Sequence, residues 1–503
     1  MESPGVSGTV DHTDSTADPR PDLRSPLDEP LYVDLDGTLY PGDTLWDSVA
    51  LMLQIAPSMA LRLPVVLLRG PLPAKAWLAD RVIPDATLLP YRAELVEVCR
   101  AERVRGRRVV LATAAHRRIA DAIAGHLGCF DAVIATDVVN RKGSAKLAAI
   151  RDDSGDRRFL YAGDDRADRN IWIASSGALT AGRAADWHAT RVGADVLGRF
   201  RDRHGRLAAL VKALRPHQWV KNLLVFVPLL ASHRVFDPAA VFDSSLLFIA
   251  FCLCASSVYL LNDLLDLEND RSHVRKRFRP IAAGTLPIPW AIVAIPVLLA
   301  SAYMVAALAS PAAATMVAVY YVMTMAYSFR LKTRLLVDVF MLAGLYTIRC
   351  LAGHAATGIP YSPWLLGFLL FLFLSLAFSK RHSELFHLQA AGGWGIKGRG
   401  YRAEDLQLIS TFGVAAGFIA ALVMGLYVTS DAVTLLYRTP ILLWMLCPLV
   451  LYWITRVWII AHRGELHDDP IVFALKDQMS YALGLIAAGL LTAATFLRLE
   501  GPV

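Results

Sequence analysis

Potential metal ligands are most concentrated in the stretch NDLLDLENDRSHVRKRFRPIAAG, residues 262–284, which directly follows an apolar run. Asn262, Asp263, Asp266 and Asp270 have a spacing that would put Asp266 one helical turn beyond Asn262 and Asp270 one turn further. Carboxylates this close repel one another unless a cation lies between them. Hard oxygen ligands suit Mg²⁺, which is often completed by water and substrate phosphates. We therefore expect Asp263, Asp266 and Asp270 to hold Mg²⁺, Asp263 and Asp266 to serve catalysis, and Asn262 to contact substrate.

Basic side chains follow these acids within a few residues. His273, Lys276 and Arg277 are placed to meet the phosphate charge that a metal leaves uncompensated. The alternative is a solvated acidic helix end beside the positive charge that cytoplasmic loops of membrane proteins carry.

A second set of polar residues begins in PLYVDLDGTLY, residues 30–40, where a buried-strand pattern runs into Asp34 and Asp36. Two later segments repeat the pattern of an apolar run with polar residues at or near its end: RVVLATAA (108–115) with Thr113 and FLYAGDDRADRNIW (159–172) with Asp164 and Asp168. Between them, NRKGSAKLAAI (140–150) supplies Lys142 and Lys146. Strands of a parallel sheet place such residues together at its carboxyl edge.

These motifs, in this order, resemble the haloacid dehalogenase-like phosphohydrolases. The resemblance implies that Asp34 attacks phosphorus to form an aspartyl phosphate, while Asp36 protonates the leaving alcohol and later activates water. It also implies a Mg²⁺ site, for which the candidate ligands are Asp34, Asp36, Asp164 and Asp168.

The same resemblance assigns phosphate binding to Thr113 and to one lysine. Lys146 fits the motif spacing somewhat better than Lys142, and both remain candidates. The segment of roughly 65 residues between the first two motifs should form a small helical cap over the α/β core.

Composition divides the 503 residues into two halves. The chain is 55% hydrophobic, and beyond about residue 219 apolar stretches of roughly 18–25 residues recur, each long enough to cross a bilayer. The net charge of +7 does not indicate nucleic acid, because the bases lie at the ends of apolar runs. None of the six cysteines shows metal-ligand spacing. We therefore expect a multidomain protein, with an α/β (Rossmannoid) domain followed by an all-α polytopic membrane bundle.

Four regions follow from this division: a disordered tail (1–28), the phosphatase-like domain (29–198), a linker (199–213) and the membrane domain (214–503). Nine spans are predicted in the membrane domain, although the short first one could instead be a re-entrant piece beside eight spans. The alternating charge of the loops places the N-terminal domain in the cytoplasm and Val503 on the far side of the cell membrane. The nine are roughly 219–233, 240–262, 287–309, 311–329, 335–356, 362–380, 406–428, 439–461 and 479–498.

The motif N-D-x-x-D-x-x-x-D followed by H-x-x-K-R-x-R-P-I-A-A-G resembles the first aspartate motif of the UbiA-type membrane transferases. The resemblance covers about residues 207–498 and includes YSFRLK (327–332) with Asp338. It implies a nine-helix bundle with a Mg²⁺–diphosphate site, to which Tyr327 and Lys332 would contribute.

The chain departs from typical members where they carry a second aspartate motif. Here SKRHSEL supplies Lys380, Arg381 and Glu384, a set suited to binding anions directly. With this segment and with RPHQWVKNLLVFVP (215–228), the sequence resembles the decaprenyl-phosphate phosphoribosyltransferase branch of the family. That branch implies phosphoribosyl diphosphate as donor and a polyprenyl phosphate as acceptor.

Three polar residues of the predicted spans remain to be assigned. Lys221 and Asn222 are substrate-binding candidates, although an interfacial lysine can simply extend toward water. Arg349, near the end of the fifth predicted span, is either functional or an anchor at the outer surface.

The leading hypothesis is phosphoribosyl transfer to a membrane lipid, followed by removal of the 5-phosphate by the N-terminal domain. The alternatives are an aromatic-acceptor prenyltransferase of the same superfamily and a non-catalytic lipid-binding scaffold. The sequence decides neither the lipid length nor whether the chain forms a homo-oligomer.

Overall fold

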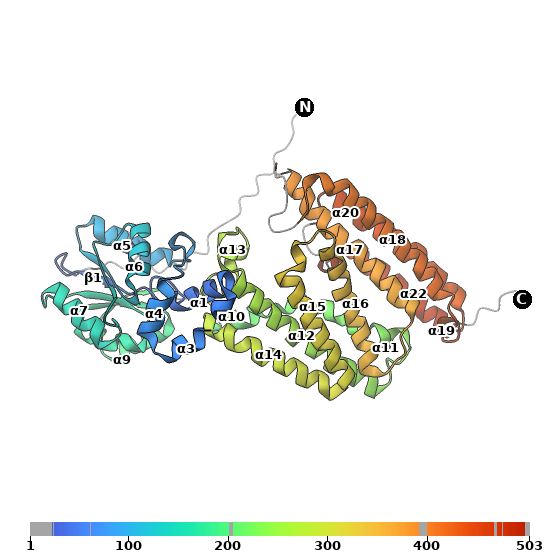
Figure 1. Cartoon of the computed structure of the whole chain (residues 1–503), viewed down its shortest axis with the longest axis horizontal. Helices are drawn as coiled ribbons and strands as arrows, with labels where there is room; N and C mark the ends of the chain where they lie inside the picture. Colours follow the sequence, from blue (N-terminus) through green and yellow to red (C-terminus); the bar gives the residue numbers. More distant parts are fainter. Residues whose placement is uncertain are drawn as a thin grey trace, which may run out of the picture. The chain divides into compact units, whose positions relative to one another are not determined.

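The computed structural model describes the chain except for residues 1–22, 24, 61, 201–204, 391, 393–399, 467–469, 475 and 498–503. Most of the predicted tail and residues 201–204 of the predicted linker therefore lie outside the described residues. The chain divides into two compact units, residues 1–210 with 263–291 and residues 211–262 with 292–503 (Figure 1). The stretch that carries the aspartate motif thus groups with the N-terminal domain.

The first unit is built on a six-stranded parallel sheet in the order β3-β2-β1-β4-β5-β6. The order reverses between β1 and β4, which pair directly, with Leu31 opposite Leu160. Ligands bind at such a switch point, beyond the carboxyl ends of the strands. The strands are β1 (Leu31–Val33), β2 (Val109–His116), β3 (Ala132–Thr136), β4 (Leu160–Gly163), β5 (Gly177–Ala181) and β6 (Val196–Phe200).

Helices connect the strands and cover the sheet, so β1 and β4 are fully buried and read as continuous apolar runs. The segment between β1 and β2 is helical, as expected of a cap. It contains α1 (Thr44–Ile55), α2 (Pro57–Ala60), α3 (Leu63–Leu68), α4 (Pro71–Ala79), the 3₁₀ turn η1 (Ala86–Leu88) and α5 (Ala93–Val104). The later helices are α6 (Arg117–Leu127), α7 (Ser144–Ser154), η2 (Arg166–Asp168), α8 (Arg169–Ala174) and α9 (Arg183–Arg191).

The predicted linker is more structured than expected. Its first residues belong to β6, which pairs with β5, and α10 (Arg206–Ala213) occupies its second half. The paired strand β6 extends the α/β domain two residues past the predicted boundary at 198.

The second unit is helical. Eight helices among the described residues are long and apolar enough to cross a membrane. They are α12 (Pro238–Leu265), α14 (Ile288–Ala309), α15 (Pro311–Phe329), α16 (Val337–Thr357), α17 (Pro363–Ala390), α18 (Leu406–Val428, preceded by η6, Ala403–Asp405), α20 (Leu446–His462, preceded by η7, Pro440–Met445) and α22 (Gln478–Phe496). Shorter pieces are η5 (Leu331–Thr333), α19 (Asp431–Thr434) and α21 (Pro470–Ala474).

The predicted first span, 219–233, is not among these eight. It consists of the 3₁₀ helix η3 (Pro216–Phe226) followed by the short α11 (Val227–Ala231). Buried residues recur here every third position, at Asn222, Val225 and Pro228, which matches the three residues per turn of a 3₁₀ helix. The backbone also approaches α16 closely, since a Cβ at Gly353 would lie 2.2 Å from the Val225 carbonyl oxygen. The first predicted span is therefore a short irregular piece beside eight long helices, as the alternative count of eight spans expected.

Candidate active sites

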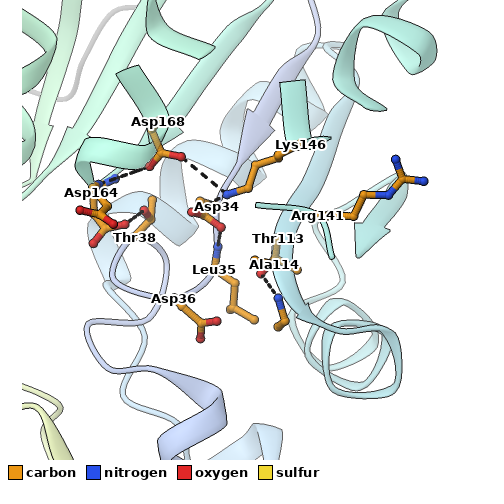
Figure 2. A network of polar contacts seen from close by, with 12 residues as sticks. Asp34, Leu35, Asp36, Thr38, Thr113, Ala114, Arg141, Lys146, Asp164 and Asp168 are labelled. Atoms are coloured by element: carbon orange, nitrogen blue, oxygen red, sulfur yellow. Dashed lines mark hydrogen bonds and ion pairs between the residues drawn. The ribbon is translucent and has the colours of Figure 1, made fainter. Parts of the chain in front are cut away.

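The carboxyl ends of β1, β2 and β4 bring together the predicted hydrolase residues (Figure 2). Asp34 directly follows β1, Thr113 lies on β2, and Asp164 directly follows β4. Asp34 is buried, and its Oδ1 accepts a hydrogen bond from the Leu35 amide at 2.8 Å. The remaining oxygen, Oδ2, lies 2.7 Å from the Lys146 ammonium.

Burial and neighbouring charges have opposing effects on the pKa values of Asp34 and Lys146. Burial raises the pKa of Asp34 to about 6, although the ammonium of Lys146 acts in the opposite direction. Burial would lower the pKa of Lys146, but the carboxylates of Asp34 and Asp168 raise it above its ordinary value. Lys146 therefore stays charged, and Asp34 can ionise near neutral pH as a nucleophile must.

Asp168 anchors the other side of Lys146. Its Oδ1 accepts a hydrogen bond from the Tyr161 hydroxyl at 2.8 Å and lies 3.7 Å from Lys146 Nζ. Its Oδ2 accepts from the backbone amide of Asp164 at 3.2 Å. These contacts fix the turn after β4 and with it the direction of the Asp164 carboxylate.

Asp34, Asp164 and Asp168 form a metal-ligand set whose oxygens lie within 4.8 Å of one another. Glycines make the approach possible: a Cβ at Gly37 would lie 2.0 Å from Asp164 Oδ2, and one at Gly163 would lie 2.7 Å from Asp168 Oδ2. Burial first, and then the neighbouring carboxylates, raise the pKa of Asp164 well above its ordinary value. Three carboxylates this close carry more negative charge than the single ammonium of Lys146 compensates, and such an all-oxygen set fits Mg²⁺.

Asp36 does not join this set, which corrects its prediction as a metal ligand through its side chain. The Asp36 carboxylate accepts hydrogen bonds from the Thr44 amide at 2.8 Å and the Thr44 hydroxyl at 3.3 Å. Burial, and next the carboxylate of Asp43, raise the pKa of Asp36 well above its ordinary value. A raised pKa favours the protonated form, and a protonated carboxyl group suits the general acid of a phosphate-ester cleavage.

The structure also separates the two candidate lysines. Lys146 is buried against Asp34, whereas Lys142 is exposed. Thr113 is fully buried, and its hydroxyl accepts a hydrogen bond from the Ala115 amide at 3.0 Å.

Lys75 is a residue that the sequence analysis missed. It belongs to α4 of the cap, and its ammonium donates to the Ala114 carbonyl oxygen at 2.6 Å. With Asp36 and His116 it lines a recess between cap and sheet. Its only sequence signal was a lone lysine in an apolar helix, which does not reveal that the cap folds back over β2.

The aspartate motif has a different local structure from the single helix that its spacing predicted. α12 ends at Leu265, and Asp266 precedes a separate helix, α13 (Leu267–Ser272). Asp263 and Asp270 are buried, and Arg279 Nη1 bridges them at 3.2 Å and 2.5 Å. A guanidinium thus supplies the cation that these carboxylates need, and the donor chemistry also suits a divalent metal in its place.

The basic residues after the motif are more exposed to solvent than the acidic ones. His273, Lys276 and Arg277 are exposed, and Lys276 and Arg277 belong to the turn η4 (Lys276–Phe278). Lys276 Nζ lies 3.9 Å from Asp270, while the Arg277 guanidinium lies over the ring of Phe278. Their charges are available to an anionic ligand.

The predicted residues Asn262, Lys221, Asn222, Tyr327 and Lys332 lie in the second unit. Asn262 is the last residue of α12 that belongs to the second unit. Lys332 lies half-buried in η5. Tyr327 packs at the edge of an apolar cluster formed with α12 and α16.

Arg349 lies inside the bundle. Its Nε donates to Asn222 Oδ1 at 2.9 Å, its Nη2 donates to the Tyr320 hydroxyl at 2.9 Å, and its guanidinium lies over the rings of Tyr320 and Tyr346. The side chain is 5% exposed. These contacts rule out the role of an outer-surface anchor and tie η3 to α15 and α16.

Arg381 has a different environment from the one predicted. It is fully buried in α17, where it pairs with Asp338 at 2.7 Å and with Glu384. The Tyr401 hydroxyl donates to the other oxygen of Asp338. Two carboxylates compensate the Arg381 charge inside the protein, so the structure assigns Arg381 to packing between α16 and α17 and not to direct anion binding. Lys380, its half-buried neighbour, remains a candidate.

Residues 223–484 match the UbiA prenyltransferase family, and residues 31–171 match the haloacid dehalogenase-like hydrolases. The chain is 38% identical over 463 residues to uncharacterized protein y4nM of Sinorhizobium fredii, which covers 91% of this chain and 90% of the relative. This alignment spans both halves.

Two further relatives match a smaller share of this chain. Nodulation protein NoeC of Azorhizobium caulinodans is 35% identical over 284 residues, covering 55% of this chain and 91% of that protein. The decaprenyl-phosphate phosphoribosyltransferase of Mycolicibacterium smegmatis is 35% identical over 305 residues, covering 58% and 93%. Each of these relatives corresponds, over nearly its whole length, to little more than half of this chain.

Proposed function

We propose, on the premise that this chain belongs to the UbiA prenyltransferase family and carries an N-terminal haloacid dehalogenase-like domain, that it catalyses two consecutive steps on one membrane lipid. The membrane domain transfers 5-phosphoribose from phosphoribosyl diphosphate to a polyprenyl phosphate. The N-terminal domain then hydrolyses the 5-phosphate of the lipid-linked ribose.

The transfer step is supported by the match of residues 223–484 to the UbiA prenyltransferase family and by the similarity of this chain to decaprenyl-phosphate phosphoribosyltransferases. In this reaction an oxygen of the lipid phosphate attacks C1 of the ribose, and diphosphate leaves. Little general-base chemistry is needed, because the attacking phosphate is already anionic. Mg²⁺, when bound, neutralises charge on the departing diphosphate. Asp263, Asp266 and Asp270 would hold it, while Lys276 and Arg277 would contact phosphate oxygens.

The hydrolysis step rests on one observation, the buried Asp34–Lys146–Asp168 arrangement with Asp36 beside it. Asp34 attacks phosphorus, Asp36 gives its proton to the leaving ribose oxygen, and water then releases inorganic phosphate from the aspartyl phosphate. Lys146 and Thr113 orient the phosphate oxygens. Asp34, Asp164 and Asp168 would hold Mg²⁺, which supplies charge neutralisation for the transferred phosphoryl group.

A cytoplasmic location of the N-terminal domain agrees with the basic loops, which carry Arg275 and Arg330 among others. It requires the chain to cross the membrane before α12. At roughly 2 Å per residue for a 3₁₀ helix and 1.5 Å for an α-helix, η3 and α11 together reach about 30 Å, the thickness of the hydrocarbon core. These two pieces would therefore make the first crossing.

The test is to supply radiolabelled phosphoribosyl diphosphate and polyprenyl phosphate to the purified full-length protein and separate the lipid products. Wild type should form a ribosyl lipid without the 5-phosphate, and Asp34→Asn should accumulate the phosphorylated lipid at an unchanged transfer rate. Equal ratios of the two lipids in both proteins would refute coupled hydrolysis. Label from a prenyl diphosphate entering an aromatic acid would favour an aromatic prenyltransferase, and no Mg²⁺-dependent product at all would favour a lipid-binding scaffold.

A further inference from the structure

Arg271 connects the aspartate-motif stretch to the α/β domain within the first unit. It follows Asp270 directly, and its Nη2 lies 2.9 Å from Asp47 Oδ1 and donates to the Tyr40 hydroxyl at 2.7 Å. The side chains of Arg271 and Asp47 are 4% and 1% exposed, although they are 224 positions apart in the sequence. Arg271 Nε also donates to the Ala282 carbonyl oxygen, which holds the stretch in a compact loop.

A second contact a few residues later involves the backbone. Gly284 has a φ of +71°, and a Cβ placed there would lie 3.2 Å from the Gly42 amide nitrogen and 3.5 Å from Pro41 Cβ. Only glycine combines this backbone conformation with such a close approach. Ile281, Ala282 and Leu286 are buried around it. We call residues 267–286 the docking loop.

The surface that the docking loop contacts is the segment that carries Asp36. Its backbone returns on itself, because the Gly37 amide donates to the Gly42 carbonyl oxygen at 2.9 Å and Asp36 forms a bridge with Tyr40. Thr44 then holds the Asp36 carboxylate. Asp47 lies in the first turn of α1, just beyond Thr44. Tyr40 and Asp47 therefore flank the turn that orients Asp36.

Removing Arg271 would leave a charge buried without its partner. Burial raises the pKa of Asp47, and Arg271 is the first of the groups that act against this rise. A buried carboxylate that loses its partner is strongly destabilised where it lies, so the start of α1 should shift toward water. Such a shift would move Thr44, and with it the acid–base group.

We propose that the docking loop holds the Asp36 segment in its working geometry and that Arg271 is the positioning residue of this contact. The hydrolase site is thus completed by a loop whose sequence belongs to the transferase. This inference rests on the proposed phosphohydrolase function of the N-terminal domain.

The experiment uses purified full-length protein in detergent with p-nitrophenyl phosphate as the hydrolase substrate. Arg271→Met should lower kcat at least about tenfold and leave KM nearly unchanged. General acid–base catalysis typically contributes roughly 100- to 10,000-fold to a rate, and a misplaced Asp36 should lose part of that contribution. Arg271→Lys should recover part of the loss. Asp47→Asn should lower kcat as well, and the double variant should be no worse than the poorer single one. The matched control is Arg275→Met, which removes an exposed arginine of the same loop.

Hydrogen exchange of the amides of residues 37–47 provides a readout that does not depend on activity. These amides should exchange faster in Arg271→Met than in wild type or Arg275→Met. An active wild type with unchanged kcat in Arg271→Met would overturn the positioning role. A wild type without hydrolase activity would instead refute the proposed function. Exchange would then decide the docking contact by itself, since equal rates in wild type and Arg271→Met would overturn it.

Discussion

Lys146 Nζ lies 2.7 Å from Asp34 Oδ2, and both groups are buried at the carboxyl edge of the sheet. The ammonium opposes the effect of burial on the Asp34 carboxyl group, so this proposed nucleophile can ionise more readily than an isolated carboxylate buried in the same place. Single substitutions that remove one charge each can therefore test the proposed hydrolase site.

Lys146→Met should raise the pKa of Asp34 further above about 6, because the opposing charge is gone. Each unit of this rise leaves roughly tenfold less ionised nucleophile at a pH below the new pKa. Hydrolysis of p-nitrophenyl phosphate near neutral pH should therefore fall and partly recover as the pH is raised. Lys142→Met, at an exposed position, should keep the wild-type pH profile; a loss in Lys142→Met alone would reverse the assignment.

Mg²⁺ binding to the hydrolase site should depend on pH. The pKa values of Asp34 and Asp164 are raised, so these carboxyl groups must lose protons before they bind a metal. Protons are released on binding, and affinity therefore rises as the pH passes through about 6. The Mg²⁺ concentration that half-saturates hydrolysis should fall by up to about tenfold per pH unit for each proton released. A half-saturating concentration that stays constant between about pH 5.5 and 7.5 would contradict this metal site.

Asp263→Asn and Asp266→Asn should each abolish Mg²⁺-dependent transfer without loss of folded protein. A metal-bound carboxylate contributes charge stabilisation of several kcal/mol in the transition state, so a loss of at least about 100-fold is expected. Transfer from labelled phosphoribosyl diphosphate measures it, and size-exclusion chromatography checks folding. Glu268→Gln is the matched control, because this half-buried acid lies in the same stretch but outside the predicted ligand set. Near-normal transfer in both aspartate variants would show that Asp263 and Asp266 do not form the Mg²⁺ site of the transfer reaction.

Arg381→Met should destabilise the membrane domain. Both members of the Arg381–Asp338 pair are fully buried, and removing one partner of a buried pair typically costs about 3–5 kcal/mol. A clear drop in the thermal unfolding temperature in detergent is expected, and Arg381→Met combined with Asp338→Asn should recover part of it. If Arg381→Met instead kept full stability and raised only the KM for phosphoribosyl diphosphate, Arg381 would be an anion-binding residue after all.

Much of the architecture could be predicted because it depends on short-range patterns. The apolar run before Asp34 forms a buried strand, and the long segments after residue 237 are apolar over a length that can cross a membrane, so composition and periodicity are sufficient to place them. The order of the motifs also predicted that Asp34, Thr113 and Asp164 would share one sheet edge, because parallel strands align their carboxyl ends.

Tertiary contacts decided the rest. Lys142 and Lys146 are four residues apart, and only the packing of α7 against the sheet turns Lys146 toward Asp34. The missing Cβ at Gly353 allows η3 to pack closely as a 3₁₀ helix, whereas hydropathy predicted only a short apolar span there. Arg381 was predicted to bind anions, but the structure places the distant carboxylate of Asp338 beside it, and Arg271, to which the sequence analysis gave no role, pairs with the distant Asp47. The charge of a side chain follows from the sequence, but whether that charge meets a ligand or a buried partner depends on residues far along the chain, which only the folded structure brings together.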